Sequence, residues 1–146
     1  MCPTPIQESL AIAFEKQAPL PAEETFFVQL REDLRVKRQR VAEALLAVGL
    51  KPIVPDGGYF ITVDVSSFDF RKIRCDGADS SSTPAQNMIT WLMKNKRLVV
   101  MPTWPFYTPD HRDLARDHIR ICINKKDETI EQALKILNEW AQELKN

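Results

Sequence analysis

Apolar residues recur at intervals of three, four and seven in several stretches of this chain, which is the spacing of one face of an α-helix. The longest stretch covers residues 26–48, and Gly49 stands directly after it, where a glycine commonly ends a helix. Residues 127–144 have the same spacing. A shorter stretch, residues 5–17, ends at the proline-containing residues 18–21. The pattern therefore predicts helices over these three ranges.

Between the two long helices the period changes to two. Residues 59–65 are rich in β-branched and aromatic side chains, and residues 118–123 place isoleucines at every second position. Two shorter apolar pieces, residues 50–55 and 98–101, also read as extended. A turn over residues 56–58 precedes the first of the longer strands.

The remaining segments separate these elements. Residues 84–95 resume the helical spacing, and Pro102 is predicted to end the strand at 98–101. Residues 66–83 are polar and predict an exposed loop, while 103–109 are too rich in proline to be regular. This order of elements predicts the α+β class, with a short sheet covered by long helices.

Length and composition indicate one soluble domain of 146 residues with zero formal net charge. Zero net charge removes the simplest case for binding nucleic acid or an anionic membrane, and no apolar run is long enough to span a bilayer. Four glycines argue against a glycine-rich phosphate loop. Three cysteines without C-x-x-C spacing, together with two histidines, predict reduced thiols in the cytoplasm and no metal site.

A run of arginines and lysines over residues 31–40 lies on the outer face of the long first helix. It has two interpretations, a nucleic-acid contact or a solvated helix face balanced by neighbouring acidic residues. We favour the solvated face and expect no nucleic-acid partner.

Arg120 is the candidate functional residue. It stands in the middle of the strand at 118–123, flanked by isoleucines. A desolvated guanidinium is costly unless it is paired, so Arg120 either pairs with a carboxylate of the protein or binds one in a ligand. The aromatic residues of the 103–109 segment either line such a site or simply pack.

Several segments together carry a family resemblance. They are Cys2–Gln7, Asp56–Phe60, Val63–Ser66, Lys96–Val99 and His118–Lys125. In this order they resemble the C-terminal part of the pyridoxal-phosphate aminotransferases of fold type I. Among these, the similarity is greatest to the kynurenine–oxoglutarate aminotransferases, also known as cysteine-S-conjugate β-lyases.

The resemblance implies that residues 19–146 form the family's small domain and that residues 1–18 are a remnant helix of the large cofactor domain. In the family, the arginine that matches Arg120 binds the substrate α-carboxylate. The implied substrates are kynurenine or glutamine-like amino acids and 2-oxo acids. The implied full-length form is a homodimer, with pyridoxal 5′-phosphate as cofactor. Trp104 stands where the family usually has a small residue.

The family's cofactor lysine and phosphate-binding segment match no part of this chain. We therefore expect a fragment or shortened form that is inactive alone and does not bind the cofactor. The alternative is a non-catalytic binding or regulatory domain of the same ancestry. We also expect exposed apolar helix faces that favour self-association, and a cytoplasmic location, or a mitochondrial one if a longer form carries a transit peptide.

Overall fold

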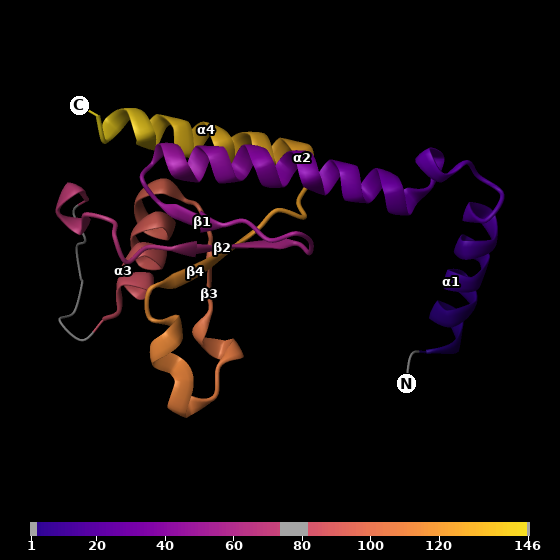
Figure 1. The fold of residues 1–146 in the computed structure, drawn as a ribbon, viewed down its shortest axis with the longest axis horizontal. Helices are drawn as coiled ribbons and strands as arrows, with labels where there is room; N and C mark the ends of the chain where they lie inside the picture. The colour runs from indigo at the N-terminus through magenta and orange to yellow at the C-terminus, as the bar shows by residue number, and fades with distance from the viewer. Residues whose placement is uncertain (1–2, 74–81, 146) are drawn as a thin grey trace. The chain divides into compact units, whose positions relative to one another are not determined.

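The computed structural model describes residues 3–73 and 82–145 of the chain (Figure 1). Residues 74–81 of the predicted polar loop, which include Cys75, and residue Cys2 therefore lie outside the described residues. In the described part, every helix is too short or too polar to cross a membrane.

The chain divides into two compact units, Met1–Val36 and Lys37–Asn146. The division falls inside the long helix α2, Phe26–Ala47, and does not coincide with the expected boundary after residue 18. The assignment of residues 1–18 to a larger cofactor domain therefore stays a prediction. Each unit is described below by itself.

The first unit contains α1, Thr4–Gln17, and the beginning of α2, so both predicted helices are confirmed. Phe14 stacks on Phe27 with 5.8 Å between ring centroids, and the Gln17 side-chain oxygen accepts a hydrogen bond from the Phe26 N–H at 2.6 Å. No residue of α1 is buried, and Leu10 on its apolar stripe is 48% exposed. The apolar face of this helix is therefore open, as expected from the sequence.

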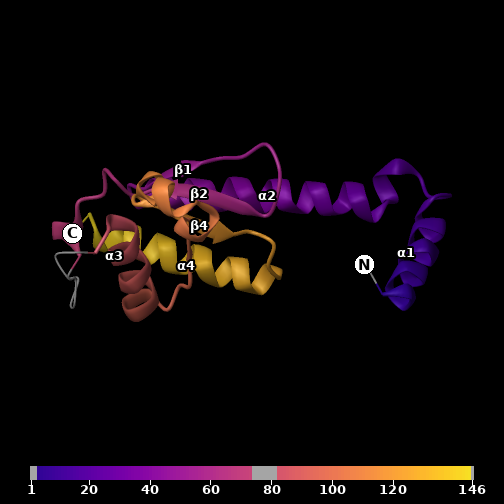
Figure 2. The same ribbon diagram turned by 90° about the horizontal axis from the view of Figure 1, so that it is seen from below.

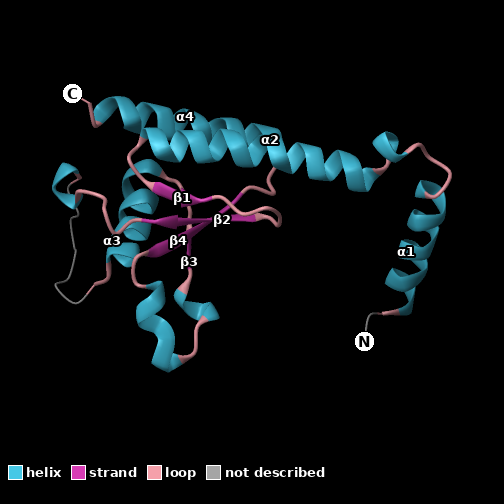
Figure 3. Cartoon of the chain, viewed as in Figure 1, coloured by secondary structure: helices cyan, strands magenta, loops and turns pink. Residues whose placement is uncertain are grey.

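The second unit contains a four-stranded antiparallel sheet with the order β1-β2-β4-β3 (Figure 3). The strands are β1 Lys51–Ile53, β2 Phe60–Asp64, β3 Met101–Pro102 and β4 His118–Cys122. Gly58, with φ +87°, lies in the turn before β2, a backbone conformation that suits glycine. The two central strands, β2 and β4, are more than fifty residues apart in sequence and pair along their full length.

The core lies between one face of this sheet and the helices that cover it (Figure 2). Alternate strand residues Ile61, Val63 and Ile119 are completely buried, because side chains in a strand point to opposite faces in turn. The covering helices are the second half of α2, α3 Pro84–Trp91 and α4 Asp127–Glu143. Sheet and helices together confirm the predicted α+β class.

The predicted strand at 98–101 is wrong in position. The preceding helix continues as a π-helical turn, Leu92–Lys96, and Arg97 then adopts the left-handed conformation with φ 53°. The Leu98 N–H bonds back to the Leu92 carbonyl, which takes it out of any strand ladder. The strand forms only at Met101–Pro102, where Pro102 is tolerated because β3 is an edge strand.

Two loop predictions also need correction. Residues 103–109 are not wholly irregular, because Trp104–Phe106 forms a 3₁₀ turn with proline in its first turn, where its missing N–H costs little. In the polar loop at 66–83, the described residues include Phe68, which is buried against Trp140 with 5.6 Å between ring centroids. Part of that loop therefore belongs to the core.

Candidate functional site

Arg120 lies near the centre of the sheet, on the face opposite the buried isoleucines of β4. Thr62 of β2 and Met101 of β3 are its register partners on either side. Because Ile119 and Ile123 are buried and residues alternate, Arg120 points away from the core helices. The alternation predicted from the sequence is therefore what places the guanidinium on the open face.

Two aromatic rings contact the guanidinium of Arg120. Its central carbon lies 4.0 Å from the ring centroid of Phe60 and 4.2 Å from that of Phe106. Phe60 comes from β2, whereas Phe106 comes from the 3₁₀ turn after β3. A cation held at this distance from ring faces is attracted by their negative potential, so the two rings restrict where the guanidinium can lie.

No carboxylate of the described residues pairs with Arg120, and its buried Nε has no hydrogen-bond partner. This is unusual, because a buried donor without an acceptor costs on the order of 1–3 kcal/mol. Several other arginines behave differently. Arg35 and Arg40 pair with Glu32 and Glu131, and Arg38 donates to the Pro55 carbonyl.

The space in front of Arg120 is a pocket of about 370 Å³. It is lined by Ile53, Thr62, Thr103, Phe106, Tyr107, His118 and Arg120. Strands β2 and β4 form its floor, and β1 and the segment after β3 form its sides. Apart from His118 and Arg120, the lining side chains are apolar or carry a hydroxyl. The pocket therefore offers hydrogen-bond donors and contains no carboxylate.

A hydrogen bond from a side chain to the backbone holds the segment after β3, which forms one side of the pocket. The Thr103 hydroxyl is buried and donates to the His118 carbonyl at 2.8 Å, which ties the start of this segment to β4. Phe106 and Tyr107 follow on the same segment and remain 66% and 38% exposed. The segment thus has a fixed base and exposed aromatic side chains beside the guanidinium.

Part of this pocket was predicted from the sequence, namely Arg120 and the aromatic segment. The structure brings Phe106 and Tyr107 of that segment to the pocket, while Trp104 does not line it. Alternation along residues 118–123 places His118 on the face of Arg120, but neither His118 nor Thr62 was predicted as a pocket residue. The position of Thr62 depends on strand pairing, which the sequence pattern does not specify.

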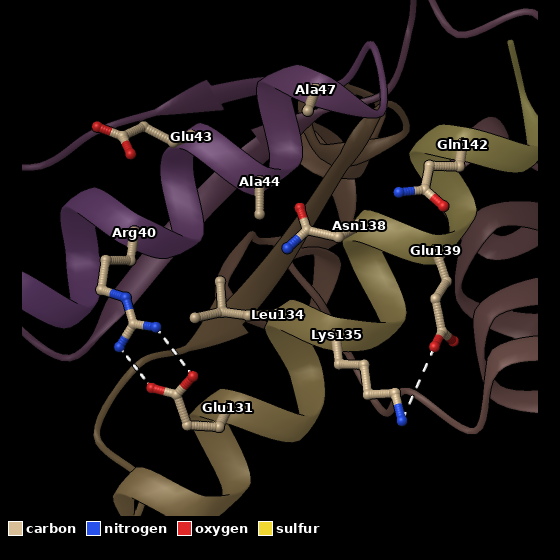
Figure 4. Close-up of a pocket in the computed structure, with 10 residues that line it drawn as sticks. All are labelled: Arg40, Glu43, Ala44, Ala47, Glu131, Leu134, Lys135, Asn138, Glu139 and Gln142. Carbon is tan, nitrogen blue, oxygen red and sulfur yellow. Dashed lines mark hydrogen bonds and ion pairs between the residues drawn. The ribbon is translucent and has the colours of Figure 1, made fainter.

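A second, larger pocket is an open groove of about 590 Å³ between α2 and α4 (Figure 4). Each of its two cationic side chains is paired with an acid in the groove. Arg40 donates to Glu131 through two nitrogens, one at 2.9 Å, and Lys135 lies 3.9 Å from Glu139. The hydrogen bond from Arg40 lowers the pKa of Glu131. The arginine and the lysine that line this groove are therefore both paired with acids, so it offers no unpaired cation to an anionic ligand, in contrast to the Arg120 pocket.

The Arg120 pocket contains neither a lysine that could attach a cofactor nor a cluster of metal-binding side chains. No lysine lines it, and three lysines elsewhere form ion pairs, Lys37 with Asp127, Lys96 with Glu143 and Lys135 with Glu139. Among residues 3–73 and 82–145, no three His, Cys, Asp or Glu side chains gather closely enough to hold a metal ion. The pocket is equipped to bind an anion through donors.

Several known proteins have a similar sequence. Kynurenine–oxoglutarate transaminase 3 of Bos taurus is 39% identical over 145 residues, which are 97% of this chain and 31% of the bovine protein. Kynurenine–oxoglutarate transaminase 1 of Homo sapiens is 33% identical over 98% of this chain and 34% of its own length. This chain thus spans about a third of these relatives.

The fold has a counterpart among solved structures. Bna3p of Saccharomyces cerevisiae superposes with a TM-score of 0.77 at 22% identity, over 97% of this chain and 32% of the yeast protein. The sequence also matches a family model, Aminotransferase class I and II, over residues 2–137. Because that model matches nearly the whole sequence, the chain belongs to the aminotransferase class I and II family.

Proposed function

We propose that this chain forms the carboxylate-binding part of an aminotransferase active site, with Arg120 as the residue that binds the substrate α-carboxylate. The observation that carries the proposal is a guanidinium held between two rings, without an acidic partner, at the floor of a pocket. The substrates would be amino acids of the kynurenine or glutamine type and 2-oxo acids, in line with the names of the relatives.

The geometry suits that role. A guanidinium offers parallel N–H donors that match the two oxygens of a carboxylate. The aromatic rings on Arg120 exclude water from its faces and leave its donor edge for the ligand. A carboxylate bound there would accept the hydrogen bond that the guanidinium lacks. Ligand binding would therefore remove the free-energy cost of the unpaired donor.

Pyridoxal phosphate is the cofactor that the family implies, and the described residues of this chain do not fit it alone. Its chemistry needs a lysine for covalent attachment and an acidic partner for its ring nitrogen. The pocket contains neither type of residue. We propose that these groups belong to polypeptide outside the 146 residues, in a full-length homodimeric enzyme. A β-lyase side activity stays a prediction.

A second function is a non-catalytic binding or regulatory domain of the same ancestry. The pocket lining supports this alternative for the chain taken alone, because it contains Arg120 and no lysine or acid to carry transamination. In that case the chain binds small carboxylates without converting them.

The Arg120 role is tested by calorimetric titration of the chain with valerate, a monocarboxylate that needs no cofactor. Arg120→Gln is expected to abolish binding, and Arg120→Lys to weaken it on the order of tenfold, because lysine keeps the charge but loses the planar fork. Arg112→Gln, which changes an exposed arginine in the 3₁₀ segment Pro109–Ala115, is the matched control. Unchanged valerate binding in Arg120→Gln would refute the proposal.

The two functions are separated by the mass of the endogenous protein, captured with an antibody against α4. A species several-fold heavier than 16.8 kDa supports a full-length aminotransferase. A species at 16.8 kDa supports the non-catalytic domain.

A further inference from the structure

His118 lies beside Arg120 on the same strand face, two residues away along β4. At about 3.3 Å per residue, this spacing places the two Cα atoms roughly 6.6 Å apart. Both side chains line the 370 Å³ pocket, although only Arg120 contacts its aromatic rings. The pocket therefore has two separate positions from which a nitrogen can reach a ligand.

The imidazole of His118 is available to a ligand. Its Nδ1 is buried and has no hydrogen-bond partner in the described part of the chain. An unpaired acceptor is buried at lower cost than an unpaired donor, so we assign the proton of the neutral ring to Nε2. That assignment leaves Nε2–H as the donor that the ring offers to an incoming group.

The charged neighbours of His118 do not occupy this donor. Asp64 is its register partner on β2 and interacts with His118 through charge, but the Asp64 carboxylate accepts its hydrogen bond from the Ser66 N–H at 2.8 Å, and the buried Nδ1 of His118 has no hydrogen-bond partner. Arg120 is the nearest charged residue on the same strand, and Tyr107 is the other titratable side chain that lines the pocket. The pocket lining therefore carries one guanidinium and one imidazole, and Asp64, the acid opposite His118 in the strand register, does not line the pocket.

We propose that His118 is a second ligand-binding residue, which selects carboxylates that carry a further anionic group over simple monocarboxylates. The inference rests on the proposed function, since it takes the first carboxylate to lie on Arg120. A ligand with one carboxylate leaves the imidazole donor unused, whereas a short dicarboxylate reaches both positions. The chemical class is thus a short-chain dicarboxylic acid, its two ends bound by Arg120 and His118.

The experiment compares glutarate with valerate, which have the same carbon chain and differ in the terminal carboxylate. Binding of each to the 146-residue chain is measured by calorimetry for the natural sequence, His118→Phe and His118→Gln. Because a hydrogen bond to a charged group contributes on the order of tenfold, we expect glutarate to bind about tenfold more tightly than valerate. His118→Phe should bring the glutarate and valerate affinities together, and His118→Gln, which retains an N–H donor, should restore part of the preference.

Equal binding of the two ligands by the natural sequence, or an unchanged preference in His118→Phe, overturns the role of His118. Loss of valerate binding in both His118 variants also overturns it, because that result indicates a structural role. The proposed function is judged separately by Arg120→Gln. If that variant binds valerate normally while His118→Phe loses the glutarate preference, the Arg120 assignment fails and the His118 assignment stands.

Discussion

The guanidinium carbon of Arg120 lies 4.0 Å from the centroid of the Phe60 ring, although Phe60 is not its register partner. Thr62 stands opposite Arg120, and Phe60 lies two residues before Thr62 in β2, on the same face of the sheet. The contact is therefore a diagonal one across two antiparallel strands, a distance that long and aromatic side chains can bridge. It links the orientation of Arg120 directly to the pairing of β2 with β4.

Replacing Phe60 with leucine tests whether this ring positions Arg120. Loss of a cation–π contact worth about 0.5–1.5 kcal/mol should weaken valerate binding about threefold to tenfold, as measured by calorimetry. Phe70→Leu, which removes a ring outside the pocket, serves as the control. Equal affinities for the two variants would mean that the ring at position 60 does not orient the guanidinium.

Arg97 is the one non-glycine residue with positive φ, at 53°, in the part of the chain that the structure describes. Such a conformation costs a side-chain-bearing residue roughly 1 kcal/mol, and glycine avoids the cost. Arg97→Gly should therefore raise the free energy of unfolding by about 0.5–1 kcal/mol in urea denaturation. Lys94→Gly, at an exposed position in the preceding π-helical turn, should lower it instead. A loss of stability in Arg97→Gly would contradict the prediction.

A capping box begins α3. The Thr83 hydroxyl accepts the Gln86 N–H at 3.3 Å, and the Gln86 side-chain oxygen accepts the Thr83 N–H at 2.8 Å. Removing the hydroxyl leaves one helix N–H without an acceptor, so Thr83→Ala should cost about 1 kcal/mol of stability. Thr83→Ser keeps the acceptor and should remain close to the natural sequence. Thermal unfolding distinguishes the two, and identical midpoints for the alanine and serine variants would show that the cap contributes nothing.

Asp64 makes the stability of the chain depend on pH. Hydrogen bonds from the Ser66 side chain and backbone hold the pKa of Asp64 below its usual range. A carboxylate with a lowered folded-state pKa stabilises the fold above its unfolded pKa, and this contribution is lost as pH falls through the lowered value. Asp64→Asn should therefore be less stable than the natural sequence at pH 7. The difference should shrink as acid is added.

This prediction is checked by urea denaturation of both proteins between pH 7 and pH 3. The natural sequence should lose more stability than Asp64→Asn over that interval, since asparagine does not titrate. A constant difference between the two at all pH values would show that the Ser66 hydrogen bonds do not act through the charge of Asp64.

The sequence alone was sufficient to predict those helices and strands whose own residues show a clear hydrophobic period. The spacing of apolar residues located α1, α2 and α4, because an amphipathic helix repeats its buried face every three to four residues. Alternation in residues 118–123 located β4 and placed Arg120 on the face opposite Ile119. An arginine between isoleucines was also visible as a candidate without any structure.

Tertiary structure decided what depends on partners distant in sequence. The edge strand β3 formed at Met101–Pro102 and not at 98–101, because hydrogen bonding to β4 and the left-handed Arg97 determined where the chain became extended. Pairing of β2 with β4 brought Phe60 onto Arg120 and Thr62 opposite it, and packing of the segment after β3 brought Phe106 to the same pocket. Periodicity assigns a residue to a face of its own strand, whereas the residues that share that face are selected by the register between strands.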